Sequence, residues 1–144
     1  MSQYVVSSDT RHVDRDLVWR FLHDEAYWSA GVPRDVVERA IDGSICFSAF
    51  AGDPDGGAPQ VGFARVVTDR ATFAYLCDVF VLAEHRGQGI GKQLMDKVMS
   101  HPELQGLRTL MLATRDAHRL YTKYGFAPLA EPARWMAIRR PYRS

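Results

Sequence analysis

VFVLAEHRGQGIGK, residues 79–92, is the stretch of sequence that decides the fold of this chain. An apolar run leads into a basic, glycine-spaced turn, and apolar residues then recur at helical spacing from position 90 to position 98. The pattern predicts a strand, a tight loop and a helix. Glycines 87, 89 and 91 permit positive φ and close backbone approach, so main-chain N–H groups can converge at the positive end of the helix. This geometry favours binding of an anion, most naturally a phosphate.

Two well-known phosphate loops do not fit this spacing. A dinucleotide fingerprint requires G-x-G-x-x-G, but here the third glycine comes one residue early and no acidic residue stands about twenty positions further on in a βαβ unit. A nucleotide P-loop requires G-x-x-x-x-G-K-[ST]. Gly91 and Lys92 are present, but Arg86 replaces the first glycine and Gln93 replaces the serine or threonine.

Composition limits the classes of function. The length of 144 residues predicts one domain over residues 1–144. A net charge of +1 gives no overall positive field that would attract nucleic acid or a membrane surface. Cys46 and Cys77 lie in apolar runs without metal-ligand spacing, so no metal is expected. No signal region opens the chain, which predicts a soluble, cytoplasmic setting. The C-terminal arginines are interpreted as a solvated tail: Arg134, Arg139, Arg140 and Arg143.

Periodicity along the chain predicts a mixed α/β fold with an antiparallel meander before the glycine loop. Asp14 is the expected N-cap of the first helix, Pro33 the expected start of the second, and Gly43 its stop. The predicted elements in order are a strand at 3–7, helices from 14 and from 33, strands at 45–51, 61–68 and 73–82, a helix behind the glycine loop, a strand at 109–113, a helix at 116–124 and a last strand at 135–138.

Two motifs in this order resemble one family. Arg86, Gly89 and Gly91 form R-x-x-G-x-G, and residues 120–126 read LYTKYGF, similar to L-Y-x-K-x-G-F. Both motifs, at this distance from each other, resemble the GCN5-related N-acetyltransferases (GNAT). The resemblance implies the order β-α-α-β-β-β-α-β-α-β, with a mostly antiparallel central sheet flanked by about four helices.

The resemblance also implies acetyl-CoA as cosubstrate. Main-chain groups of the strand before the loop would pair with the pantetheine amides, and the loop N–H groups would hold the pyrophosphate. The implied cofactor-binding residues are Val79, Phe80, Val81, Arg86, Gly87, Gln88, Gly89, Ile90, Gly91, Lys92 and Thr114. A solvated surface role for Lys92 stays open. Thr114 stands where many members carry an asparagine, so it either replaces part of that contact or caps the helix.

Two residues are candidates for catalysis. Tyr121 matches the family's tyrosine and would act as general acid, because a phenol with a pKa near ~10 is protonated at neutral pH and can donate to a departing thiolate. Helical spacing alone favours a core-facing aromatic at this position, and only the resemblance to the family points to catalysis. Asp78 lies where the family often carries an acid, and it would bind the acceptor ammonium or relay its proton. The alternative is a salt bridge with Arg65 on the neighbouring strand.

The acceptor is less well defined by the sequence. In the family the two N-terminal helices wall the acceptor site, so Tyr27 and Trp28 line it or pack as a lid. Arg65 would recognise an acceptor carboxylate. The predicted function is transfer of an acetyl group to the primary amine of a small, amino-acid-like molecule by direct attack in a ternary complex, in a monomer or homodimer. The alternatives are a non-catalytic CoA-binding regulatory module and an acetyltransferase for protein or peptide amines.

Overall fold

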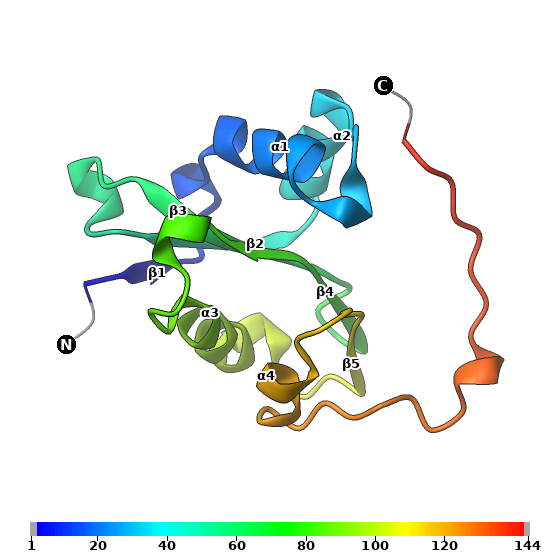
Figure 1. Ribbon diagram of the computed structural model, residues 1–144. Coiled ribbons are helices and arrows are strands. Elements are labelled where there is room, and N and C mark those ends of the chain that lie inside the picture. The colour runs from blue at the N-terminus through cyan, green and yellow to red at the C-terminus, as the bar shows by residue number, and fades with distance from the viewer. Residues whose placement is uncertain (1–2, 143–144) are drawn as a thin grey trace.

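The computed structural model describes residues 3–142 and has a helical layer on each face of a central sheet (Figure 1). The strands β1 to β4 pair in sequence order and antiparallel, whereas β5 adds in parallel to β4. Arg143, which was assigned above to the C-terminal tail, lies outside the described residues. The predicted mixed, mostly antiparallel sheet is therefore confirmed. The strands are β1 (Val5–Ser7), β2 (Ile45–Phe50), β3 (Gln60–Thr68), β4 (Phe73–Val81) and β5 (Thr109–Leu112).

The four α-helices found between residues 3 and 142 lie on opposite faces of the sheet (Figure 1). Helices α1 (Arg15–Asp24) and α2 (Arg34–Asp42) cover one face, and α3 (Ile90–Ser100) and α4 (His118–Thr122) cover the other. Asp14 caps α1 as predicted, because its side chain accepts the Leu17 N–H at 3.1 Å. Within residues 3–142, no helix combines the length and the apolar character needed to span a membrane.

The hydrophobic core is divided by the sheet into two clusters. Alternate residues of β2 explain the division, because Phe47 belongs to the α3 side and Cys46 to the α1–α2 side. On the α1–α2 side, the ring of Phe21 stacks on the ring of Phe80 with 3.9 Å between centroids. This stack attaches the first helical layer to β4.

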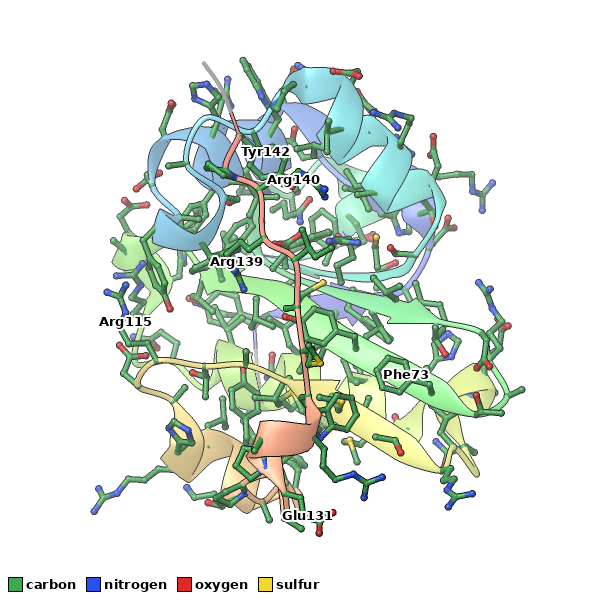
Figure 2. The ribbon with its side chains drawn as sticks, turned by 90° about the vertical axis from the view of Figure 1, so that its right-hand side faces the viewer. Phe73, Arg115, Glu131, Arg139, Arg140 and Tyr142 are labelled. Atoms are coloured by element: carbon green, nitrogen blue, oxygen red, sulfur yellow. The ribbon has the colours of Figure 1, made fainter. Side chains whose placement is uncertain are left out.

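The predicted last strand is wrong. Residues 135–138 belong to no strand, and the side chains of Met136 and Ile138 are 96% and 81% exposed. The apolar run is extended, but the segment passes across the strands and not along a sheet edge, so it has no ladder to join (Figure 2). Helix α4 is also shorter than the predicted 116–124. It begins late because the Thr114 hydroxyl accepts the Ala117 N–H at 3.0 Å and holds residues 114–117 in a turn, and it ends at Thr122.

We expect Phe21→Ala to lower the free energy of unfolding by about 3–5 kcal/mol, because it removes a 6%-exposed ring and leaves a cavity against Phe80. Val67→Ala is the control, since Val67 is 41% exposed on β3, and a change within about 1 kcal/mol is expected there. Urea unfolding of both variants measures the difference. Equal losses would contradict the role given to the Phe21–Phe80 stack.

Candidate active site

A cleft opens where β4 and β5 separate. Their pairing ends at Leu76 and Leu112, while β4 continues as far as Val81 beside β3. Within residues 3–142, the last residues of β4 therefore have one edge without a neighbouring strand. A cleft of about 620 Å³ lies at this edge, lined by Cys77, Asp78 and Val79 on one side and by Thr114, Arg115 and Tyr121 on the other.

The three predicted strand residues take different positions. Val79 lines the cleft, whereas Phe80 is buried between Phe21 and Phe63 on the α1–α2 side. The Val81 carbonyl accepts a hydrogen bond from Arg86 Nε at 3.0 Å. A core role for the side chains and an open backbone edge thus coexist in this strand, as the sequence allowed.

The glycine loop leads directly into α3, whose N-terminus has no side-chain cap. Gly87 and Gly89 have φ of 79° and 82°, which favours glycine at both positions. Gly91, in contrast, is not in the left-handed region and lies inside α3, where an added Cβ would sit 3.7 Å from Leu120. Among the described residues, no side chain caps α3, and its first turn has no acidic residue, so its first N–H groups and the positive end of its dipole face outward.

The charged and polar side chains of the loop have other contacts or face solvent. Lys92 Nζ lies 2.9 Å from Asp96 Oδ2 and its side chain is 70% exposed, which matches the solvated role left open by the sequence. Arg86 holds the end of β4, and Gln88 is exposed. The groups of residues 86–92 that remain available to an anion are therefore mainly main-chain N–H groups.

Tyr121 lies at the junction of two cavities. Its side chain is 7% exposed, and it lines both the cleft and a second groove that follows β5. Burial raises the pKa of the Tyr121 phenol, so the hydroxyl is protonated at neutral pH and can donate a proton. Tyr124 differs, because its hydroxyl donates to Asp96 Oδ1 at 2.7 Å and links the turn after α4 to α3.

Asp78 is fixed by two donors. Its Oδ2 accepts from Arg65 Nε at 2.8 Å and its Oδ1 accepts from Trp28 Nε1 at 2.9 Å. Arg65 also donates from Nη1 to Ser44 Oγ at 3.0 Å. The salt bridge with Arg65, one of the two interpretations of Asp78, is thus present. The structure also brings the predicted site residues Trp28, Arg65 and Asp78 together at one wall of the cleft. The backbone at Asp78 is strained, because its φ of 53° is unusual for a residue with a side chain.

The rim of the cleft contains a contact that the sequence did not indicate. The guanidinium carbon of Arg115 lies 3.6 Å from the centre of the Tyr27 ring, a cation–π contact between the β5–α4 connection and the chain before α2. Tyr27 is 56% exposed and packs edge-on against Trp28. Arg139, from the C-terminal segment, also lines the cleft; Figure 2 shows Arg115 and Arg139 on this side of the molecule.

Comparisons with known proteins agree with this geometry. Residues 42–128 match the model of the acetyltransferase (GNAT) domain. A protein of Gibberella zeae, provisionally named an acetyltransferase, is 34% identical over 83% of this chain and 76% of its own length. A crystal structure from Xanthomonas campestris pv. campestris, provisionally assigned to the GNAT acetyltransferases, is 50% identical and has a TM-score of 0.91 over 98% of this chain and 96% of that chain.

A more distant structure shares the fold alone. A protein of Clostridium acetobutylicum, solved with acetyl-CoA, is 16% identical with a TM-score of 0.66 over 94% of each chain. With the matches above, the class defined by the fold and the cleft is clear. The chain belongs to the GNAT family and is an acetyltransferase, which confirms the family and enzyme class predicted from the two motifs.

The reactivity of the Cys77 thiol shows whether a cysteine could act as a nucleophile in the cleft. It lines the cleft, but burial raises its pKa to about 12, and burial raises the pKa of Cys46 to about 11. In a Cys46→Ala variant, Cys77 is the sole thiol, and its alkylation by iodoacetamide at pH 8 should be at least about 100-fold slower than that of free cysteine, because the thiolate is the nucleophile. Alkylation at the rate of free cysteine, followed by mass spectrometry, would show an activated thiol in the cleft.

Proposed function

We propose that this acetyltransferase moves the acetyl group of acetyl-CoA to the primary amine of a small molecule by direct attack in a ternary complex. The observation that carries the proposal is the position of Tyr121, a buried and protonated phenol that faces the open edge of β4 across the cleft. Such a donor is suited to a reaction whose leaving group is a thiolate.

In this proposal the cofactor binds mainly to main-chain groups of the protein. The open edge of β4 beside Val79 can pair with amides of the pantetheine arm in the manner of an added strand. The uncapped N-terminus of α3, directly after Gly89, can hold the pyrophosphate. Because Lys92 is paired with Asp96 and Arg86 with a carbonyl, the N–H groups carry most of this binding.

Proton movements follow from the same positions. The acceptor ammonium first loses a proton to water or to another group in the cleft, which frees the lone pair on nitrogen. The neutral amine attacks the acetyl carbonyl carbon, the carbon–nitrogen bond forms, the carbon–sulfur bond breaks, and the Tyr121 hydroxyl gives its proton to the departing sulfur. The nitrogen then loses a second proton as the amide forms, and that proton restores the Tyr121 phenol directly or through water. Asp78 accepts a hydrogen bond from the acceptor ammonium, since each carboxylate oxygen has a second lone pair besides the one used by Arg65 or Trp28.

The acceptor class is suggested by charge. Among residues 3–142, three guanidinium groups line the cleft, those of Arg65, Arg115 and Arg139, and two carboxylates, those of Asp78 and Asp116. An acceptor with both an ammonium and a carboxylate, as in an amino acid, complements this set. The cleft also borders Tyr27 and Trp28, whose rings offer an apolar rim to the rest of the molecule.

Tyr121→Phe should lower kcat by roughly 100-fold, within the usual range for loss of a general acid, while CoA binding stays nearly unchanged. Tyr124→Phe is the matched control, because it removes a hydroxyl from the same segment of the chain. That hydroxyl donates to Asp96, which lies outside the cleft. Release of CoA thiol against a panel of amines and peptides measures turnover. Equal activity of the Tyr121 variant and the wild type would remove Tyr121 from the mechanism.

Gly89→Val should abolish CoA binding and leave the fold largely intact, because a branched side chain would stand where the phosphate meets the backbone. Gly57→Val is the matched control. Gly57 has φ of 86° and, like Gly89, nothing within 4 Å of an added Cβ, but it lies in the loop between β2 and β3. Both variants carry the same backbone strain, so calorimetry with CoA separates strain from lost binding. Wild-type affinity in Gly89→Val would contradict the anion site.

A further inference from the structure

The guanidinium groups of the cleft differ in how far they are available to a ligand. Arg65 donates to Asp78 from Nε and to a serine hydroxyl from Nη1, so two of its nitrogen atoms are used within the protein. For Arg115 and Arg139, no hydrogen bond or ion pair is recorded among the described residues. Asp116 also lines the cleft, but within the described chain it forms no ion pair with Arg115. Arg115 and Arg139 therefore keep their N–H donors for a ligand.

Tyr27 fixes the orientation of the Arg115 guanidinium. The guanidinium carbon lies 3.6 Å from the ring centre, a distance at which the planar group must lie nearly flat on the ring to avoid a clash. The ring then covers one face of the guanidinium, and the N–H donors point outward in its plane. Arg139 has no such ring contact, and for residues 136–142 no backbone hydrogen bond is recorded within the described chain. Arg115 is thus the better preorganised of the two.

Adjacent aromatic residues hold one negative and one positive group of the cleft. Trp28 donates from Nε1 to Asp78 at 2.9 Å, while Tyr27 carries Arg115 on its ring. The two rings pack edge-on with 5.1 Å between centroids, within the short 3-10 helix Tyr27–Ser29. Their contact sets the spacing between the Asp78 carboxylate and the Arg115 guanidinium. This arrangement complements an acceptor that carries an ammonium and a carboxylate at one defined separation.

We infer that Arg115 selects the acceptor by binding its carboxylate, with Tyr27 as the positioning residue that presents the guanidinium. The inference rests on the proposed acetyl transfer and deepens it, because it assigns carboxylate recognition to Arg115 and not to Arg65. The acceptor class is then the amino acids, with the ammonium on Asp78. A carboxylate accepts two parallel hydrogen bonds from a guanidinium, whereas an amide of the same size would place an NH2 group against a donor.

The first experiment measures acceptor binding without turnover. The standard amino acids and their α-amides are titrated by calorimetry into the full chain saturated with CoA, which carries no acetyl group. We expect at least one amino acid to bind, and its amide to bind at least about 10-fold more weakly, because a hydrogen-bonded charge is lost. In Arg115→Met, which keeps an unbranched stem without the charge, this preference should disappear. Circular dichroism should be unchanged, since the Arg115 side chain is exposed.

Arg119→Met is the matched control, because Arg119 is an exposed arginine of α4 that does not line the cleft, and the preference should persist there. Tyr27→Leu should reduce the preference, whereas Tyr27→Phe, which keeps the ring, should retain it. This pair separates positioning of the guanidinium from a general role in the fold. CoA affinity is measured on the same samples. Loss of CoA binding in Arg115→Met would assign the arginine to the cofactor phosphates and overturn the inference.

The inference also fails if no member of the panel binds, if the wild type binds amino acids and amides equally, or if Arg115→Met keeps the preference while Arg139→Met loses it. Turnover with acetyl-CoA then separates this inference from the proposed function. Preferential binding of an amino acid without release of CoA thiol would contradict the proposed transfer and support carboxylate recognition by Arg115. Release of CoA thiol at equal kcat/KM from amino acids and amides would support the transfer and overturn the role of Arg115.

Discussion

The bend of β4 at Asp78 is the feature on which the site depends. A residue with a side chain and a φ of 53° costs on the order of 1–3 kcal/mol, and the register of β3 and β4 shifts nearby, between Phe63 and Arg65. Hydrogen bonds to Arg65 and Trp28 hold the Asp78 carboxylate and offset this strain. Because the strand bends here, it leaves β5 after Leu76, and the cleft exists.

In the proposed cofactor complex, the bend and the glycine loop would act together on one ligand. The separated part of β4 offers main-chain groups in line, and the chain then turns through Gly87 and Gly89 into α3. An extended arm followed by an anion would therefore meet first a strand edge and then a helix N-terminus. Neither contact needs a long charged side chain, which is consistent with the pairing of Arg86 with the Val81 carbonyl and of Lys92 with Asp96.

How far the sequence predicts this structure depends on the range of each interaction. The glycine loop and the caps at Asp14 and Gly43 are local, and the sequence places them correctly. The pair of Arg65 and Asp78 follows from two neighbouring strands. The contact of Arg115 with Tyr27 joins segments far apart in the chain, and no local pattern indicates it. Residues 135–138 have the composition of a strand, but composition does not specify a partner strand, so the predicted strand is absent from the sheet.

Asp78 can pair with Arg65 and also contact the acceptor amine, but the geometry favours binding of the ammonium over removal of its proton. If Asp78 kept the proton of the acceptor ammonium, the neutral acid would leave the Arg65 guanidinium, whose side chain is 18% exposed, without its counter-charge. Binding the ammonium as a third hydrogen-bond donor preserves the ion pair and the bonds that stabilise the bend. Asp78 is therefore better suited to orient the amine than to hold its proton, and the proton would pass on to water or to another group in the cleft.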